Sequence, residues 1–526
     1  MTEWRRVLRW LAVAGSACAS LLPAPEAVAA AAAPARPEIR ALWIDSAHPG
    51  IRSATEIREL VDAARRNHVN TLFVQVRRRG EALYTGGIEP SFTDPAYDPS
   101  FDALEAAVAA GHAAGIEVHA WINAMPIWRG EAPPAGPQHV FNLHGPSASG
   151  TENWLTRARD DRQVFPVGYF VDPGHPAAQE HLVRIYLDVV RRYAVDGVHF
   201  DYIRYPETED RPPRGADVGY NAVSLARFQR TTARSDVPAS DDPAWTAWRR
   251  LQVTQLVRRI SVEARAINPR VKVSAATIAW GRPPLDRRDF ENTAPMQRIF
   301  QDWPAWLAEG LLDMAVPMNY AREADPVVRG WFDGWIAWEK RHKAERQLVI
   351  GIGGYLSAPE GVLAQITRAR ARDSGRHADG VSLFSYFRPA GPPPTADGET
   401  LPTVAAPDRL DFLSRGAARA PAVFTTPAAV PATPWLDRPE RGFLAGTVTS
   451  SSGLRLDGAR IAVRRTGWFR RTLRTTSDGN GWFGLTGLKP GRYRVRVESA
   501  ADGIVSSPVE IEVRAGAVGR AALQTR

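Results

Sequence analysis

One rhythm dominates residues 38–415, in which a short β-rich run, a loop and an amphipathic helix follow one another eight times. Runs with a period of two, separated by segments with helical periodicity, are typical of alternating strands and helices. Eight such units in one stretch predict a closed (β/α)8 TIM barrel of the α/β class. The predicted strands are residues 39–45, 70–76, 117–124, 196–201, 272–280, 311–320, 347–355 and 379–387.

An open doubly wound sheet is the rival architecture for this pattern. Such a sheet usually carries a glycine-rich phosphate-binding loop directly after its first strand. Here the first predicted strand runs into the segment DSAH at 45–48, and no GxGxxG follows it. The barrel is therefore favoured, and functional residues are expected at the carboxyl ends of its strands.

The first 29 residues have the pattern of a secretory signal peptide. Arginines precede an apolar run at 10–22, and Ala27-Val28-Ala29 supplies small residues at the cleavage position. We therefore expect an exported protein, periplasmic or extracellular. The pair Arg5-Arg6 leaves the twin-arginine route open beside the general secretory route.

The only cysteine, Cys18, lies within this predicted signal peptide. Attachment of a lipid at Cys18 is the minority alternative, because Gly15 stands where a lipoprotein signal prefers an aliphatic residue. The apolar run at 10–22 is shorter than the roughly 20 residues that a membrane-spanning helix needs. The sequence therefore predicts no transmembrane helix.

After the barrel the composition changes twice. Residues 416–441 are rich in Ala, Pro and Thr, which predicts an extended linker. Residues 442–526 contain short alternating runs separated by turns such as Asp457-Gly458, which predicts a small all-β sandwich. The formal net charge of +9 favours an anionic surface, but Lys and Arg are spread along the whole chain. Nucleic acid is not an expected partner.

The fourth predicted strand, in the segment DGVHFDYIRYP at 196–206, carries the strongest functional signal. Strand alternation directs Val198 and Phe200 towards the helices, and His199 and Asp201 into the barrel. A carboxylate at a strand end, with Arg204 and Tyr205 on the following loop, suits an oxocarbenium-like centre. The simpler alternative is an ion pair between Asp201 and Arg204 that only fixes the loop.

Polar and aromatic residues also end the other predicted strands. Because barrel strand ends converge at one rim, we expect these side chains to form a substrate site with Asp201. The predicted substrate-binding residues are Asp45, Arg77, Trp121, Asn123, His199, Arg204, Tyr205, Asn319 and Tyr320.

Several segments together resemble a known family. They are VRRRGEALY (76–84), HAWINA (119–124), DPGHP (172–176), VDGVHFDYIRYP (195–206), SLARFQRTT (224–232), VPMNY (316–320) and VIGIGGY (349–355). This part of the chain resembles the glycosyl hydrolase-like 10 family of bacterial exported proteins. The resemblance implies a glycoside hydrolase that cleaves a polysaccharide, and in some members peptidoglycan glycan strands. Residues 442–526 resemble the carboxypeptidase regulatory-like sandwich.

Hydrolysis of a glycosidic bond requires two carboxyl groups, one as nucleophile or base and one as proton donor. Asp201 is the expected nucleophile or base. Ile203 stands where family-18 chitinases have their catalytic Glu, so the proton donor has to come from another strand. Glu81 is the first candidate, and Asp45, Asp172 and Glu207 remain open.

Two other functions fit the sequence less well. A non-catalytic carbohydrate-binding or wall-anchoring barrel would keep the polar rim without a proton donor. A metal-dependent hydrolase would use His48, His119 and His199 with a nearby Asp, but the chain has no HExxH motif. We therefore expect no metal and no cofactor. The sequence does not indicate an oligomeric state.

Overall fold

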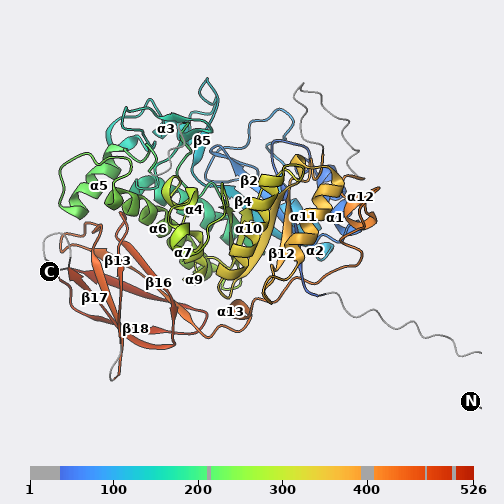
Figure 1. Cartoon of the computed structure of the whole chain (residues 1–526). Helices are drawn as coiled ribbons and strands as arrows, with labels where there is room; N and C mark the ends of the chain where they lie inside the picture. The colour runs from blue at the N-terminus through green and yellow to red at the C-terminus, as the bar shows by residue number, and fades with distance from the viewer. Residues whose placement is uncertain (1–35, 210–214, 392–407, 468–470, 500–504, 526) are drawn as a thin grey trace, which may run out of the picture. The chain divides into compact units, whose positions relative to one another are not determined.

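The computed structural model describes residues 36–209, 215–391, 408–467, 471–499 and 505–525. The predicted signal peptide and Cys18 lie outside the described residues. Within these ranges the chain forms a barrel followed by a β-sandwich (Figure 1).

Eight parallel strands form the barrel, which confirms the predicted fold class. Each strand pairs with its neighbour in the barrel, and the last pairs with the first, so that the sheet closes. The strands are β1 (Ile39–Ile44), β2 (Thr71–Arg78), β4 (Glu117–Asn123), β8 (Gly197–Asp201), β9 (Lys272–Ile278), β10 (Met314–Met318), β11 (Gln347–Gly353) and β12 (Gly380–Phe384).

Amphipathic helices cover the outside of this barrel. In the first helix the Ser53 side chain accepts a hydrogen bond from the Glu56 N–H, an N-cap that fixes where the helix begins. One face of that helix is buried through residues such as Ile57 and Leu60. The larger helices are α1 (Ala54–Arg66), α2 (Ala103–Ala113), α4 (Pro176–Arg192), α6 (Pro243–Ile267), α10 (Pro326–His342) and α11 (Pro359–Arg370).

Further short elements interrupt the basic pattern, most of them beyond the carboxyl ends of the strands. They are β3 (Glu81–Ala82), β5 (Pro126–Trp128), α3 (Val140–His144), β6 (Val164–Phe165), β7 (Gly168–Phe170), α5 (Ala222–Thr232), α7 (Arg287–Phe290), α8 (Ala294–Gln297), α9 (Trp303–Ala308) and α12 (Asp411–Arg415), with 3-10 turns at Gly150–Glu152 and Gly354–Leu356.

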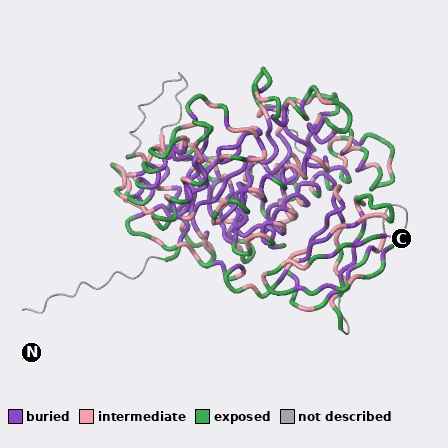
Figure 2. Tube along the Cα trace, turned by 180° about the vertical axis from the view of Figure 1, so that it is seen from behind, coloured by how far each residue is buried: buried purple, intermediate pink, exposed green. Residues whose placement is uncertain are grey.

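Strand alternation separates two apolar layers in the barrel. Val198 and Phe200 pack outward in the large cluster between strands and helices, as the sequence predicts. The interior is filled by a second cluster that includes Trp43, Phe73 and Trp121. Figure 2 shows these buried strands at the centre of the barrel. The interior is therefore packed below the rim, and any open space lies at its mouth.

Residues 442–525 form the predicted sandwich of two sheets. One sheet has the order β16-β13-β19 and the other β15-β14-β17-β18. Its core holds apolar residues from both sheets, such as Val463, Phe483 and Val495. The strands are β13 (Gly442–Thr449), β14 (Arg460–Arg465), β15 (Thr472–Thr476), β16 (Trp482–Leu488), β17 (Gly491–Ser499), β18 (Val509–Val513) and β19 (Val518–Gln524).

The segment 416–441, predicted as an extended linker, lies against the amino-terminal end of the barrel. The carbonyl oxygen of Ala429 accepts from the Glu38 N–H at 2.8 Å, and that of Ala428 accepts from the Asn70 side chain at 2.9 Å. Val430 packs against the interior cluster of the barrel. A short helix, α13 (Pro434–Asp437), follows. We call residues 423–435 the strap, because they close the barrel floor.

The sandwich contacts the barrel mainly through α6, which touches β13, β16 and β19. Glu263 of α6 accepts from Nε1 of Trp482 at 2.7 Å and forms an ion pair with Arg520 at 2.7 Å. Arg227 of α5 donates two hydrogen bonds to the carboxylate of Asp457, each 2.8 Å long. Among the described helices, none is long and apolar enough to cross a bilayer.

Candidate active site

A cavity of about 440 Å³ lies at the mouth of the barrel. The carboxyl ends of the strands and the loops that follow them supply its walls. Polar, charged and aromatic side chains share the lining, which suits a ligand with many hydroxyl groups and flat faces. The lining residues are Asp45, Ala47, His48, Gln75, Arg78, Trp121, Asn123, Asp201, Tyr202, Arg204, Glu207, Trp280, Met318, Tyr320 and Phe384.

Asp201, the last residue of β8, has the most perturbed carboxyl group in this cavity. It is 7% exposed, and its two oxygens accept from Nε1 of Trp121 at 3.1 Å and from the N–H of Tyr202 at 2.7 Å. Burial raises the pKa of Asp201 to about 6, against the opposing effects of Arg204 and of these hydrogen bonds. The group can therefore take up or release a proton near neutral pH.

Asp45 lines the same cavity from another wall. One layer deeper, Trp43 donates from Nε1 to Nε2 of His199 at 3.0 Å, so side chains of the first and fourth barrel strands meet inside the barrel. Asp45 lies two positions after Trp43, and Asp201 lies two positions after His199. Strand alternation therefore directs both aspartates towards the barrel interior. Oδ1 of Asp45 lies 2.6 Å from Nδ1 of His48. The cavity lining thus contains three carboxyl groups, those of Asp45, Asp201 and Glu207.

Arg204 approaches Asp201 from the following loop. Its guanidinium lies over the rings of Tyr202 and Trp280, 4.7 and 5.1 Å from their centroids, and 3.9 Å from the carboxylate of Glu207. The side chain is buried, and its Nε has no hydrogen-bond partner among the described residues. The guanidinium group of an arginine that lines a cavity can bind a carboxylate of a ligand.

A β-bulge in β2 changes which arginine reaches the cavity. The register of β2 against β4 shifts between Gln75 and Arg77, and such a shift reverses the side-chain alternation beyond it. Arg77 is consequently buried away from the cavity in a two-pronged ion pair with Glu89, with both distances 2.6 Å. Arg78 lines the cavity instead of Arg77, the predicted substrate-binding residue.

Glu81, the first candidate for the proton donor, does not lie in the cavity lining with Asp201. The chain reverses at Gly80, whose φ of 79° is one that glycine adopts easily, and Glu81 then pairs with Arg78 in a short antiparallel hairpin. There it accepts from the hydroxyl of Thr93 at 2.6 Å. Burial raises the pKa of Glu81, although its hydrogen bonds with Thr93 and the nearby arginines Arg78 and Arg79 oppose this shift.

Two more predicted binding residues are buried below or beside the cavity. His199 lies in the barrel interior, where Nδ1 is 2.9 Å from the hydroxyl of Ser274 and the ring stacks on Phe73. Asn319 turns outward and donates to the carboxyl group of Glu339 on α10 at 2.9 Å. Burial raises the pKa of Glu339 to about 8. The structure therefore places both residues in the packing of the barrel.

Tyr205 and Asp172 form a buried pair behind the loop. The hydroxyl of Tyr205 donates to Asp172 at 3.3 Å, and the hydroxyl of Ser224 donates to the same oxygen at 2.9 Å. Burial raises the pKa of Asp172 to about 6. Both side chains are fully enclosed, so they support the loop that carries Arg204 rather than line the cavity.

The structure brings six of the predicted site residues together, namely Asp45, Trp121, Asn123, Asp201, Arg204 and Tyr320. Trp121, Trp280 and Tyr320 supply the aromatic walls. Sequence reasoning missed Arg78, because nothing in the residues of β2 shows the bulge. It also missed Met318 and Phe384, although the alternation of their strands could have indicated them.

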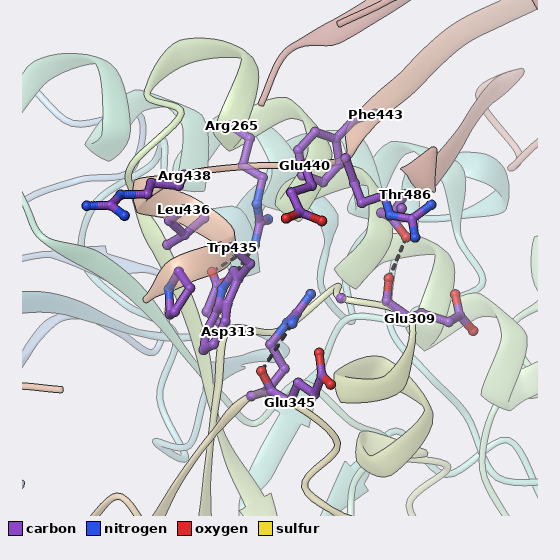
Figure 3. A pocket seen from close by; sticks show the side chains of 15 residues that line it. Arg265, Glu309, Asp313, Glu345, Trp435, Leu436, Arg438, Glu440, Phe443 and Thr486 are labelled. Atoms are coloured by element: carbon purple, nitrogen blue, oxygen red, sulfur yellow. Dashed lines mark hydrogen bonds and ion pairs between the residues drawn. The ribbon is translucent and has the colours of Figure 1, made fainter. Parts of the chain in front are cut away.

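A second cavity, of about 480 Å³, lies between the barrel, the strap and the sandwich (Figure 3). Its buried acid, Asp313, is already bound by Arg265 at 2.7 and 2.8 Å and by Nε1 of Trp435 at 2.7 Å. Figure 3 shows Arg265 and Trp435 converging on Asp313. This carboxylate holds the surrounding segments together, so the barrel mouth is the better candidate site.

The three histidines of the metal hypothesis do not converge. His48 lies at the rim, His199 lies one layer deeper, and His119 lies at the next layer beside Glu117 at 3.4 Å. Within the described ranges, no group of three or more His, Cys, Asp or Glu residues has the arrangement to hold a metal ion.

A closed (β/α)8 barrel with carboxyl groups, arginines and aromatic rings at its mouth has the architecture of a glycoside hydrolase. The comparisons with known proteins agree. The chain belongs to the glycosyl hydrolase-like 10 family, which it matches over residues 38–354. Residues 444–525 match the carboxypeptidase regulatory-like domain.

Named relatives are distant. Glycosyl hydrolase DigH of Escherichia coli K12 is 26% identical over 308 residues, which cover 55% of this chain and 65% of that protein, less than two thirds of its length. Glycosyl hydrolase YngK of Bacillus subtilis is 24% identical, over 76% of this chain and 74% of that protein. The solved glycoside hydrolase domain of PgaB (BpsB) from Bordetella bronchiseptica shows 15% identity and a TM-score of 0.48, over 66% of this chain and 94% of that one.

Proposed function

We propose that this protein is an exported glycoside hydrolase in which Asp201 and Asp45 form the pair of reacting carboxyl groups. The observation that carries the proposal is the raised pKa of Asp201, about 6, in a cavity that Asp45 also lines. A carboxyl group that keeps its proton close to neutral pH is suited to protonate a leaving oxygen. In this proposal Asp201 is the proton donor, in place of the nucleophile or base that the sequence analysis expected.

The reaction follows from this arrangement. Asp201 transfers its proton to the glycosidic oxygen while the bond between that oxygen and the anomeric carbon breaks. The hydrogen bonds from Trp121 and Tyr202 then stabilise the carboxylate that Asp201 becomes. Asp45 either removes a proton from the attacking water, whose oxygen bonds to the anomeric carbon, or attacks that carbon itself and forms a glycosyl ester. In the second case Asp201, now a carboxylate, takes a proton from a water whose oxygen displaces Asp45 from the anomeric carbon. Either route consumes one water and yields a new reducing end and a leaving sugar with a free hydroxyl group.

The proposed substrate is a glycan with carboxylate groups, of which the glycan strand of peptidoglycan is the first candidate. Arg204 lines the cavity and brings a positive charge to it. The half-buried side chain of Arg78 makes no hydrogen bond or ion pair with another described residue. Two guanidinium groups at one cavity favour a ligand with negative charge. Export of the protein, proposed from the signal sequence, would bring it to such a polymer.

The test is the release of new reducing ends from intact peptidoglycan, from glycan strands stripped of peptide, and from chitin oligomers. We expect wild type to act best on the stripped strands, because they leave their carboxylates open. Asp201→Asn should show at least about a hundredfold lower rate. Asp62→Asn, an exposed acid on α1, is the matched control. Equal rates for Asp201→Asn and wild type would refute the proposal, and binding without turnover by wild type would favour a carbohydrate-binding barrel.

A further inference from the structure

The basic character of the chain is concentrated in the sandwich. Residues 442–526 hold 14 Lys and Arg against six Asp and Glu, a formal net charge of +8 out of +9 for the whole chain. Arginines do occur along the whole sequence. In the barrel, however, acidic residues are about as numerous as basic residues. In the sandwich, basic residues outnumber acidic ones.

Strand alternation places many of these arginines on one surface. Along β17 the odd-numbered residues Tyr493, Val495 and Val497 enter the core, and the arginines between them are exposed. The register sets Arg464 of β14 opposite Arg494, and Ala462 opposite both Arg474 and Arg496, so these residues share a face. We call this surface the basic sheet face; it comprises Arg460, Arg464, Arg474, Arg492, Arg494 and Arg496.

Three acids lie beside the six arginines of this face, and one of them, Glu512, stands opposite Arg492. Glu498 pairs with Arg474 at 2.8 Å, and Glu510 pairs with Arg494 at 2.9 Å. Glu512 is taken by Arg514, outside the face, at 3.0 Å. Among the residues that the structure describes, four arginines of the face then have no ion pair: Arg460, Arg464, Arg492 and Arg496.

The arrangement is unfavourable for an unoccupied sheet. Arg464 and Arg494 stand directly opposite each other on neighbouring antiparallel strands, where like charges destabilise a sheet, and of the two only Arg494 has an ion pair, with Glu510. The barrel does not relieve this repulsion, because α6 contacts β13, β16 and β19 of the other sheet. A polyanion bound across the face would remove the repulsion.

We propose that the basic sheet face binds a linear anionic glycan with carboxylates on its repeating sugars. Alternate residues of a strand lie about 7 Å apart, and neighbouring strands about 4.8 Å, so the face presents a regular grid of guanidinium groups. Each group can hold a carboxylate through two parallel hydrogen bonds. The choice of a glycan among the possible polyanions rests on the proposed function. The prediction that the face binds a polyanion rests on the charge pattern alone.

The chemistry of the face disfavours two other kinds of partner. Recognition of single-stranded nucleic acid on a sheet uses exposed aromatic rings for base stacking, and the described exposed side chains of this face include none. Membrane binding needs apolar side chains that insert below the headgroups, and these are also lacking among the described exposed residues of the face. A flexible carboxylated chain requires neither feature.

The test measures binding of polygalacturonate, with its fully methyl-esterified form as the neutral control. All variants carry Asp201→Asn, so that cleavage cannot interfere. A triple variant, Arg464→Gln, Arg492→Gln and Arg496→Gln, is compared with a control triple that removes the same charge from exposed barrel helices, Arg58→Gln, Arg191→Gln and Arg329→Gln. We expect the Kd for polygalacturonate to rise about tenfold or more in the first triple and less than about twofold in the control.

Three results would overturn the proposal: an equal loss in both triples, equal binding of the methyl ester, or tighter binding of a thymidine oligonucleotide or of phosphatidylglycerol vesicles than of polygalacturonate. Matched thermal unfolding of the two triples shows that both remain folded. Binding that depends on the basic sheet face, in a protein whose wild type cleaves no glycan, would refute the proposed function alone.

Discussion

Asp201 combines two properties that oppose each other. Burial in the barrel mouth raises its pKa to about 6, whereas Arg204 and the donors Trp121 and Tyr202 act in the other direction. The balance keeps a protonated carboxyl group available up to neutral pH. It also keeps donors in place for the carboxylate that remains after proton transfer. A proton donor of a glycoside hydrolase needs both.

The first prediction concerns the pH dependence of kcat/KM. In the proposed mechanism the protonated form of Asp201 is the active one, so kcat/KM should fall about tenfold per pH unit above roughly pH 6. In Trp121→Phe the carboxylate loses a hydrogen bond, so this descending limb should move upward by about half a unit to one unit. Initial rates of glycan cleavage between pH 4 and pH 9 measure the slope of the limb in wild type and its displacement in Trp121→Phe. A limb that falls towards acid pH instead would make Asp201 the nucleophile or base.

At the scale of single residues, alternation predicted the site where the strands are regular. Asp201, Trp121 and Asn123, which the sequence placed at the barrel mouth, line the cavity because β4 and β8 pair regularly up to their ends. Arg77 was placed wrongly at the cavity. The bulge in β2 that buries it depends on pairing with the neighbouring strand, which the residues of β2 do not indicate. The burial of Tyr205 depends in the same way on an enclosed partner, Asp172, 33 positions away.

At the scale of elements, the loop after β8 is connected to the sandwich. Tyr205 of this loop bonds to Asp172, whose Oδ1 also accepts from the Gly174 N–H at 2.7 Å. Arg227 donates to the Gly174 carbonyl oxygen and forms the paired hydrogen bonds to Asp457 of the sandwich. The ion pair is nearly enclosed, with exposed fractions of 5% and 11%.

The second prediction concerns this ion pair. Asp457→Asn leaves the Arg227 charge buried without its partner, so the free energy of unfolding should fall by about 2–4 kcal/mol. Glu510→Gln breaks the exposed pair with Arg494 and should cost less than about 1 kcal/mol. Urea unfolding followed by tryptophan fluorescence gives both values. Equal costs for the two variants would show that the pair between barrel and sandwich contributes no more than a surface ion pair.

Most elements could be predicted from the sequence, and the exceptions have physical reasons. All eight barrel strands lie within the predicted ranges or extend a few residues beyond them, because buried parallel strands have strong apolar runs. The strand β19, Val518–Gln524, was missed, since its small residues have a low strand propensity and its pairing with β13 is distant in sequence. The strap was predicted as extended chain, but composition does not show what an extended chain docks against.

At the scale of the whole molecule, the strap joins both domains. Its carbonyl oxygens accept hydrogen bonds from the barrel floor, and Val430 fills the amino-terminal end of the barrel interior. Trp435 at its end binds Asp313, which also holds Arg265 of α6. The position of the sandwich, and with it the basic sheet face, therefore depends on a segment that is rich in alanine and proline.

The third prediction tests the strap. Val430→Asp places a charge against the apolar interior and should lower the free energy of unfolding by about 2 kcal/mol or more. Ala429→Asp, an exposed neighbour in the same segment, should change it by less than about 0.5 kcal/mol. Calorimetry of the full chain measures both variants. If the two substitutions cost the same, Val430 does not close the barrel floor.

The most direct measurement of the central proposal is the initial rate of reducing-end release from stripped glycan strands by three variants. Asp201→Asn and Asp45→Asn should each lose at least about a hundredfold in kcat, because each removes one of the two carboxyl groups that the reaction needs. Glu81→Gln should lose less than about tenfold, since its carboxyl group lies outside the cavity lining. A full rate in Asp45→Asn together with an inactive Glu81→Gln would contradict the assignment of the pair.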